Sequence, residues 1–335
     1  MKIHEQINEV LAHAPVGSNL LDLLIKNGLD QLPMPAAGAT RIRWQALAAV
    51  AQFDLSLAKH YEGHSDALAI INEIKGSDNF APQGTWGVWA AEAPGARTIF
   101  NRAADGTFYV SGAKLWCSGA NTAQNALVTA WHGDDVMPQL VAIELNQPGV
   151  VVEAENWKAV GMAGSQSVGV IFKNVPCQTV GESGAYLKRP GFWQGGAGVA
   201  ACWLGGAVGI ASTLQQSMQQ HSDNSGFKLA SLGKVHLAIC QTVEILRSAA
   251  SWIDAHPVAD ASSVALQARL SAEQCAKVVL DEAGKALGAG PFCLDEKFAK
   301  AAADLPVFIR QSHAEKDFAA LGERVVQNKP DSWVL

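Results

Sequence analysis

The sequence contains few charged residues for its length. Lys, Arg, Asp and Glu make up 17% of its 335 residues, against about 25% in an average soluble domain. The net charge is −6. Proteins that bind nucleic acid or an anionic membrane surface carry clustered Lys and Arg, so this composition argues against both partner classes. A chain with so little charge is expected to bury much of its surface, in a large core or against other subunits.

The sequence also lacks paired cysteines and an apolar run of membrane length. No C-x-x-C pair occurs, which argues against a disulfide framework or a zinc site and fits reduced thiols in the cytoplasm. The longest apolar run, residues 197–211, is shorter than the ~20 residues that span a bilayer. It is also rich in Gly, so we expect a buried helix and no membrane span. The N-terminus lacks the apolar run of a signal peptide. The six cysteines are Cys117, Cys177, Cys202, Cys240, Cys275 and Cys293.

Apolar spacing divides the chain into three segments. Residues 1–79 and 184–335 repeat apolar side chains with a helical period, whereas residues 80–183 contain short runs rich in Val, Ile, Thr and aromatics, typical of strands. Helices and strands in separate blocks predict an α+β protein rather than a parallel α/β sheet. We expect an N-terminal helical domain, a middle β domain and a C-terminal helical domain with these bounds.

Several elements can be placed within the segments. Asp105-Gly106 predicts a hairpin turn. Ser262 and Ser263 are candidate N-caps of a helix that runs to Gly288, where glycine is a natural stop. Strands are predicted over residues 107–112, 126–131, 139–145, 149–156 and 168–176, and a last helix over residues 305–326.

Two motifs suggest binding sites, each with a simpler alternative. Residues 196–201 read G-A-G-V-A-A, a loose dinucleotide fingerprint, but no strand precedes them. Close helix packing is therefore the preferred interpretation. His60 and His64 stand four apart, a spacing that can hold a metal on one helix face. No companion cluster of His or Cys is evident, so we expect no metal and place both residues at a pocket or an interface.

His313 and Asp317 would lie one turn apart on a helix and could pair.

The run Trp116-Cys117-Ser118 follows a predicted strand. A Trp is ordinary in a core, but an indole can equally form a wall for a flat aromatic ligand. The β segment holds an unusual density of indoles, more than packing normally requires. They are Trp86, Trp89, Trp116 and Trp131.

A series of phrases, in this order and spacing, resembles the acyl-CoA dehydrogenase superfamily. The phrases are W-A-A-E-A-P-G-A (residues 89–96), G-T-F-Y-V-S-G-A-K-L-W-C-S-G-A (106–120), G-M-A-G-S-Q-S-V-G-V-I-F-K-N-V-P (161–176), P-G-F-W (190–193), G-G-A-V-G-I-A (205–211) and K-A-L-G-A-G (285–290). The resemblance covers roughly residues 41–322. It implies a fold with an N-terminal helical domain, a central β-barrel-like domain and a C-terminal four-helix bundle. It also implies FAD bound between the last two, and a homodimer or homotetramer.

The resemblance assigns roles to residues of the β segment. In the family a Trp packs on the flavin ring, and a nearby hydroxyl bonds close to the reactive ring nitrogen. The matching residues here are Trp116, Cys117 and Ser118, and the phrase around Glu92 would supply backbone contacts to the ring. An indole stacked on a flat ring and a hydroxyl at its edge are groups that tune flavin chemistry.

Further matches lie in the C-terminal segment. Lys285 with Gly288 occupies the place of a Gln that reaches the FAD pyrophosphate from a neighbouring subunit, and a Lys could serve a diphosphate by charge. Phe227 belongs to a phrase that touches FAD, although the Arg that starts this phrase is missing here.

The main departures from the family pattern are catalytic. The family's base is a Glu that removes a proton α to the thioester while the flavin takes a hydride, and Ser312 stands at that position here. The base position used by some other members corresponds to Val199, which cannot act as a base. An Arg that helps to hold acyl-CoA corresponds to Ala200.

Three functions compete on this basis. The first is an FAD-dependent oxidoreductase acting on an acyl-CoA or related substrate, with the base relocated to Glu315 or Asp317. The second is a flavin monooxygenase or oxidase of the same fold, in which Ser312 and His313 support the reaction with oxygen, since a His can donate a hydrogen bond and titrate near neutral pH. The third is a non-catalytic, flavin-binding or scaffold member. The sequence places the first slightly ahead of the second and leaves the small-molecule substrate open.

Overall fold

The computed structural model describes residues 1–76, 83–133, 135–220, 225–327 and 333. The chain forms two compact units, each made of segments that are separate in sequence. The strand unit comprises Val10–Leu32 and Ser56–Phe192, and the helical unit comprises Met1–Glu9, Pro33–Leu55 and Trp193–Leu335. Strands and helices occur in separate blocks along the chain, which confirms the predicted α+β class.

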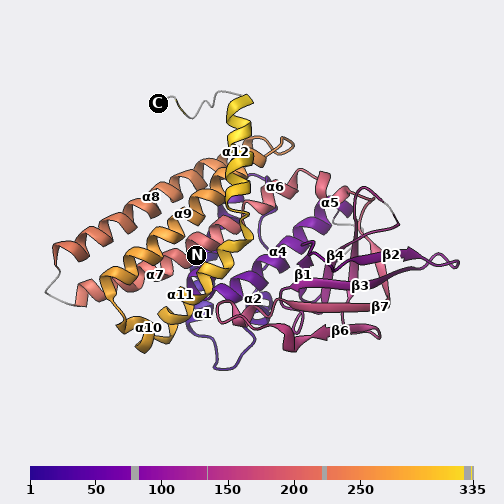
Figure 1. The fold of residues 1–335 in the computed structure, drawn as a ribbon, viewed down its shortest axis with the longest axis horizontal. Coiled ribbons are helices and arrows are strands. Elements are labelled where there is room, and N and C mark those ends of the chain that lie inside the picture. The colour runs from indigo at the N-terminus through magenta and orange to yellow at the C-terminus, as the bar shows by residue number, and fades with distance from the viewer. Residues whose placement is uncertain (77–82, 134, 221–224, 328–332, 334–335) are drawn as a thin grey trace. The chain divides into compact units, whose positions relative to one another are not determined.

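The strand unit is built on one mixed sheet of seven strands (Figure 1). The order is β1-β4-β5-β7-β3-β2, with β6 paired to β7. Only β1 and β4 run parallel among these pairs. The five predicted strands are all present, and β2 and β3 form the predicted hairpin, with Gly106 in its turn at a φ of 89°. The bounds are β1 Trp86–Trp89, β2 Thr98–Arg102, β3 Phe108–Cys117, β4 Asn125–Ala130, β5 Gln139–Glu144, β6 Val150–Glu153 and β7 Val168–Thr179.

The sheet curls back on itself at Trp131, directly after β4. The Phe100 N–H donates to the Trp131 carbonyl at 2.8 Å, and the Trp131 N–H donates to the Thr98 carbonyl at 2.9 Å. Strand β2 therefore contacts the end of β4 as well as β3. The curled sheet encloses apolar side chains that alternate along its strands. They include Trp89, Phe100, Val110, Val128, Val141, Val170 and Phe172.

Helices α2 (Leu20–Lys26) and α4 (Leu55–Lys75) group with the strands, apart from Leu55. Residues of α4 pack on the sheet through Ala67, Ile70 and Ile71, which share a buried cluster with strand residues. Helix α4 thereby holds His60 and His64 in the strand unit. The short helix α5 (Ala185–Lys188) follows β7.

Long helices make up the helical unit, where α7, α8 and α9 run side by side (Figure 1). Glycines let α7 approach α3 closely. A Cβ at Gly205 would clash with the Ala48 carbonyl, and one at Gly209 would lie 3.0 Å from the Gln52 oxygen. Helix α6, not a strand, precedes residues 197–201, so these residues do not form a dinucleotide-binding loop. Gly198 instead lies close to Leu47 and Trp44 of α3, as helix packing predicts. The helices are α3 Thr40–Phe53, α6 Gly191–Gly196, α7 Val199–Gln220, α8 Gly226–Ala255, α9 Ser262–Leu287, α10 Gly290–Leu294, α11 Glu296–Phe308 and α12 Glu315–Gln327; α1 (Ile3–Ala12) contributes residues to both units.

The start of α9 differs from the prediction. Ser262 is already helical, the cap position is Ala261, and Ser263 makes no cap. Asp260 takes over this role, because its carboxylate accepts from the Ser262 N–H at 2.9 Å and from the Ser262 hydroxyl at 2.8 Å. The end is as predicted, since Gly288 caps the helix with a φ of 66°.

The predicted last helix over residues 305–326 is wrong as one element. Helix α11 ends at Phe308, a 3₁₀ turn covers Ile309–Gln311, and α12 begins at Glu315. Ala314, between them, has a left-handed φ of 47°, which no α-helix accommodates. The break places Ser312 and His313 in a turn rather than on a helix face.

Two helical stretches of the described chain are long and apolar enough to cross a membrane by length and composition alone. In the first, Gly191–Gln220, 78% of an apolar 18-residue stretch is buried, and α7 within it forms the buried helix expected for the run 197–211. In the second, α8, only 22% of such a stretch is buried. It exposes large apolar side chains along its length, namely Phe227, Leu229, Leu237 and Ile245.

Candidate functional site

The site predicted around Trp116 lies where β3 carries a bulge. Between Lys114 and Cys117 the pairing of β3 with β7 shifts register, and Trp116 has a left-handed φ of 59°. Simple alternation would put Trp116 on the same face as the buried Lys114. The bulge instead turns the indole outward, where it is 54% exposed, and Cys117 inward. Such a conformation costs on the order of 1–3 kcal/mol and clusters at binding sites. The Trp116 side chain thus lies at the surface and not in the core.

The two neighbours of Trp116 differ in what they offer a ligand. Cys117 is fully buried in the sheet core, its Sγ donates to the Lys114 carbonyl at 3.3 Å, and burial raises the pKa of its thiol well above the usual range. Only its backbone can meet a ligand. Ser118 Oγ lies 2.7 Å from Ser167 Oγ, which lies 3.0 Å from Ser165 Oγ. The Ser165 hydroxyl donates to the Met162 carbonyl at 2.8 Å, so Ser167 donates to Ser165 and Ser118 donates to Ser167. The Ser118 oxygen can therefore accept a hydrogen bond from a ligand.

Glu92 follows β1 and forms an ion pair that the sequence did not reveal. Lys114 Nζ donates to Glu92 Oε1 at 2.8 Å, and the Thr129 hydroxyl donates to the same oxygen at 2.8 Å. Lys114 is 2% exposed, whereas the Glu92 side chain is 42% exposed. Burial lowers the pKa of the Lys114 ammonium, although Glu92 opposes that shift. The sequence signal for this pair was a Lys in β3, at a position where strand alternation predicts a side chain that faces the core.

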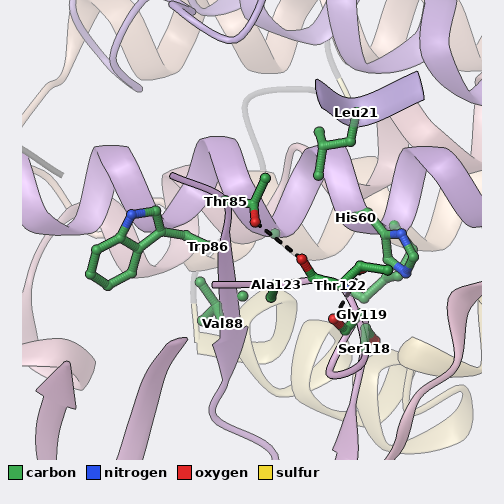
Figure 2. Close-up of a pocket in the computed structure, with 12 residues that line it drawn as sticks. Leu21, His60, Thr85, Trp86, Val88, Ser118, Gly119, Thr122 and Ala123 are labelled. Carbon is green, nitrogen blue, oxygen red and sulfur yellow. Dashed lines mark hydrogen bonds between the residues drawn. The ribbon is translucent and has the colours of Figure 1, made fainter. Parts of the chain in front are cut away.

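A small cavity of about 20 Å³, room for roughly one water, lies beside Ser118 (Figure 2). His60 of α4 lines it, and its Nε2 lies 2.9 Å from the Ser165 carbonyl. The Thr85 hydroxyl donates to the Thr122 carbonyl at 3.3 Å across the wall. Gly119 is required here, because a Cβ would lie 3.2 Å from the His60 ring and its φ is 72°. His60 therefore fixes the turn that follows Ser118.

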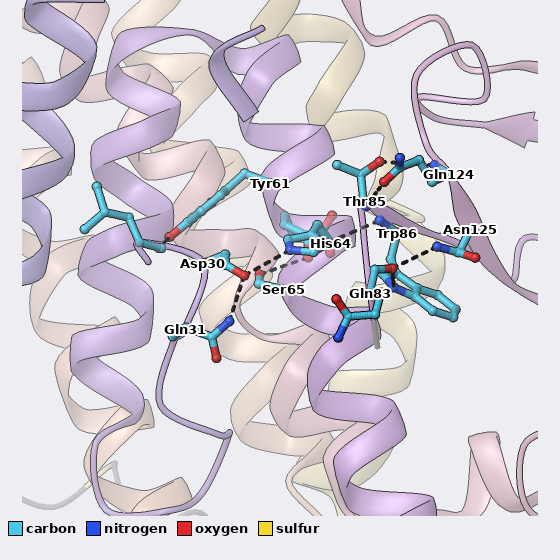
Figure 3. A network of polar contacts seen from close by, with 12 residues as sticks. Asp30, Gln31, Tyr61, His64, Ser65, Gln83, Thr85, Trp86, Gln124 and Asn125 are labelled. Carbon is cyan, nitrogen blue, oxygen red and sulfur yellow. Dashed lines mark hydrogen bonds and ion pairs between the residues drawn. The ribbon is translucent and has the colours of Figure 1, made fainter. Parts of the chain in front are cut away.

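His64 has a structural role in a buried network (Figure 3). The Trp86 N–H donates to His64 Nδ1 at 3.2 Å, so the His64 proton lies on Nε2, which is 3.3 Å from Asp30 Oδ2. Burial raises the pKa of the Asp30 carboxyl, but the hydrogen bond from His64 outweighs it and the net shift is downward. Within the described residues no group of His, Cys, Asp and Glu could hold a metal ion.

The predicted catalytic residues of the helical unit lie around the turn before α12. Ser312 is 5% exposed, and its Oγ accepts from the Ala314 N–H at 3.2 Å. The His313 ring is 74% exposed and lies 3.5 Å from Asp317, the pair expected from the sequence. Asp317 also accepts from the His313 N–H at 3.1 Å, so it caps α12. Glu315, in the first turn of α12, is exposed.

Two residues of α9 contact this turn and stabilise it, and the sequence analysis predicted neither. Arg269 donates to the Gln311 carbonyl at 2.8 Å and to the Gly196 carbonyl at 3.0 Å. Glu273, which is fully buried, accepts from Arg310 at 3.2 Å. Burial raises the pKa of the Glu273 carboxyl, but hydrogen bonds from Lys277 at 2.6 Å and from Ser312, with the charge of Arg310, outweigh burial and the net shift is downward. A Glu among the apolar positions of α9 was the only sequence signal.

The remaining predicted cofactor residues lie at the start of α8 and the end of α9, where Lys234 of α8 pairs with Glu282 of α9 at 3.0 Å. Phe227 is 89% exposed near the start of α8. Lys285 pairs with Asp281 and lies 3.4 Å from Glu282, and these carboxylates raise the pKa of its ammonium. Its charge is therefore already balanced. Glu92, Trp116, Cys117 and Ser118 belong to the strand unit, whereas Ser312, His313, Glu315, Phe227, Lys285 and Gly288 belong to the helical unit.

The strand-unit residues fit a flavin. A flat ring system needs an apolar face to stack on and hydrogen-bonding groups at its edge. Trp116 offers an exposed indole held outward by a strained backbone, and Ser118 offers a hydroxyl two residues away.

Comparisons with known proteins identify the fold. No family model matches the chain, and no curated protein matches it. Among solved structures it is similar to dibenzothiophene monooxygenase TdsC from Paenibacillus sp. A11-2, solved with FMN and indole, at 17% identity and a TM-score of 0.81 over 98% of this chain and 95% of that one. It is similar to KijD3 in complex with FMN and a dTDP-sugar, at 16% identity and a TM-score of 0.78, over 99% and 94%. It is also similar to methanesulfinate monooxygenase MsuC from Pseudomonas fluorescens, at 16% identity and a TM-score of 0.72, over 98% of this chain and 95% of that one. The chain therefore has the acyl-CoA dehydrogenase fold.

Proposed function

We propose that this chain is a flavin-dependent oxidoreductase. The observation that carries the proposal is the exposed Trp116 at a strained bulge, followed by the hydroxyl of Ser118. The fold of the FMN-bound structures supports it. In this proposal the Trp116 indole covers one face of the ring system, the Ser118 hydroxyl bonds to its edge, and the backbone around Glu92 contacts it.

The geometry favours an oxygen-using reaction, a flavin monooxygenase, over acyl-CoA dehydrogenation. Ser312 stands where the family's base belongs, and Asp317 is engaged in capping α12. His313 is exposed beside a carboxylate, and its ring can donate a hydrogen bond. A bound, reduced flavin would supply the electrons for the reaction with oxygen. The residues assigned to catalysis are Ser312 and His313, and the substrate is a small molecule.

Dehydrogenation of an acyl thioester is the second candidate. One observation favours it: Glu315 is exposed in the first turn of α12, three residues from the position of the family's base. A carboxylate there could remove a proton from a substrate. Reduction of the flavin by an acyl-CoA without oxygen would support this candidate.

We propose FMN rather than the FAD expected from the family resemblance. Lys285, the residue matched to the pyrophosphate contact, pairs with Asp281 and lies 3.4 Å from Glu282, so its charge is less available to a diphosphate. FMN has a single phosphate and does not need this contact. The FMN in TdsC and KijD3 is consistent with this choice.

The remaining proposals concern organisation. The domains 1–79, 80–183 and 184–335, with a β-barrel-like middle domain and a four-helix bundle, remain predictions, as does a cytoplasmic location. We propose a homodimer or homotetramer, because α8 exposes several large apolar side chains and such surfaces mark interaction sites.

The first experiment is the visible spectrum of the freshly purified protein, followed by titration with FMN and FAD. We expect a flavin spectrum or tight FMN binding, with FAD weaker. Oxygen uptake with added reduced FMN and a substrate panel then separates the monooxygenase from the dehydrogenase. A colourless protein that binds neither flavin would refute the proposed function and favour a non-catalytic role.

A further inference from the structure

Lys114 makes three hydrogen bonds with one buried ammonium group. Its Nζ donates to Glu92 Oε1 at 2.8 Å, to the Thr129 hydroxyl at 2.8 Å and to the Thr129 carbonyl at 3.1 Å. A Lys ammonium has three protons, so all of them are used. The Thr129 hydroxyl closes the triangle by donating to the same Glu92 oxygen.

Stability alone does not account for such a group. Burying an ammonium is costly, and a buried ion pair is often no more stable than apolar side chains of the same volume. The surrounding strands are rich in Val, Leu and Ala, which would fill the space without this cost. A buried ammonium does, however, fix one geometry among several, because its three donors have few alternative acceptors.

The segments that Lys114 joins are those that carry the proposed flavin contacts. Lys114 lies on β3, two residues before Trp116 and four before Ser118. Glu92 lies in the segment after β1. β1 and β3 are not neighbours in the sheet order, so no ladder of backbone hydrogen bonds aligns their ends. The Lys114–Glu92 pair is a direct polar link between the two segments.

We propose that Lys114 is a positioning residue of the flavin site. It holds the backbone around Glu92 in register with the end of β3, so that Trp116 and Ser118 face a ligand together with that backbone. This inference rests on the proposed function, since Lys114 would position residues of the same flavin site. It predicts that removing the ammonium changes the bound flavin more than it changes the fold.

The test compares Lys114→Met with the control Arg189→Met. Arg189 forms an ion pair with Glu73 at 2.6 Å in the same unit, but it touches neither segment. FMN affinity, the visible absorption band and the induced circular dichroism of bound FMN are measured with the thermal midpoint. We expect Lys114→Met to weaken FMN binding about ten-fold and to alter the flavin spectrum. We expect Arg189→Met to alter only the thermal midpoint.

Two further variants keep the test decisive. If Lys114→Met does not fold, Thr129→Val removes one acceptor and one donor with little change in volume, and about a three-fold loss of FMN affinity is expected. Glu92→Gln combined with Lys114→Met should weaken FMN no more than Lys114→Met alone, because both remove the same link. Wild-type affinity and spectrum in Lys114→Met, or in Thr129→Val if only that variant folds, would overturn the inference. If the wild type itself binds no flavin, the proposed function fails together with it.

Discussion

At the scale of single residues, the site depends on a break in strand alternation. Trp116 would be a core residue if β3 ran regularly, because it is two residues from the buried Lys114. The bulge and the left-handed φ of Trp116 exchange the faces of Trp116 and Cys117. An exposed indole and a buried thiol are therefore two consequences of one extra residue in the strand.

Trp116→Ala should separate ligand binding from folding. Because the indole is half exposed, we expect its loss to lower the free energy of unfolding by less than about 1 kcal/mol, whereas Phe172→Ala in the core should cost about 3–5 kcal/mol. FMN affinity should fall about ten-fold, near 1.4 kcal/mol. Denaturant unfolding and FMN titration measure the two effects, and a core-sized loss of stability in Trp116→Ala would show that the indole is structural.

Asp30→Asn should weaken the protein in a pH-dependent way. The folded pKa of Asp30 lies below its unfolded value of about 3.9. Its contribution is therefore complete above that pH and is lost as the pH falls through the folded pKa. At pH 7 we expect a loss of about 1–3 kcal/mol, which shrinks towards pH 3.

Urea unfolding at pH 7 and pH 3 measures the effect of Asp30→Asn. Glu182→Gln, at an exposed position of the same unit, is the control, and its effect should be small at both pH values. An equal loss for Asp30→Asn at both pH values would contradict the role assigned to the His64 pair.

At the scale of elements, glycine serves different purposes in α7 and α8. In α7, Gly205 lets the helix backbone approach α3, and a Cβ there would clash with the Ala48 carbonyl. In α8, Gly233 is exposed and a Cβ would meet no atom within 4 Å. The packing partner, not the helical sequence, decides whether glycine is needed.

Gly205→Ala and Gly233→Ala should therefore change stability in opposite directions. Glycine in a helix interior costs about 1 kcal/mol relative to alanine, so Gly233→Ala should raise the free energy of unfolding by up to that amount. Gly205→Ala should lower it by about 1–3 kcal/mol through overpacking. Both are measured by chemical denaturation, and stabilisation by Gly205→Ala would show that α3 and α7 can separate without loss.

At the scale of the whole molecule, the chain has few charged residues, and its helix α8 exposes large apolar side chains. This helix is apolar enough to pass for a membrane span, yet most of it is not buried in the chain. Contact with a second copy would cover its apolar side chains. The proposed homo-oligomer follows from this unsatisfied surface and from the charge content together.

Leu237→Asp should shift the protein towards a smaller species. Leu237 is 57% exposed on α8, and a carboxylate buried in an interface without a partner is strongly unfavourable. Val160→Asp, at an exposed position of the strand unit, is the control and should leave the molar mass unchanged. Light scattering after size-exclusion chromatography measures the molar mass of each variant. A monomeric wild type would rule out the proposed oligomer.

Local patterns in the sequence determined much of the fold. Runs of β-branched residues predicted the five strands from 107 to 176, and helical spacing predicted helices on both sides of this block, because both signals depend on neighbours close along the chain. The order of the phrases around Trp116 and residues 161–176 predicted the acyl-CoA dehydrogenase fold, which the comparison with solved structures confirmed. The hairpin at Gly106 and the stop at Gly288 followed from glycine's backbone freedom, which is also local.

Only the tertiary structure decided how the candidate site is formed. The bulge that exposes Trp116 arises from the pairing of β3 with β7, and the pair of Lys114 with Glu92 joins β3 to the segment after β1, a strand that is not adjacent to β3 in the sheet. The turn at Ser312 depends on Arg269 and on the left-handed Ala314, where helical spacing alone predicted a continuous helix. Each of these features is set by contacts between residues far apart in the chain, and such contacts leave no periodic trace in a single sequence.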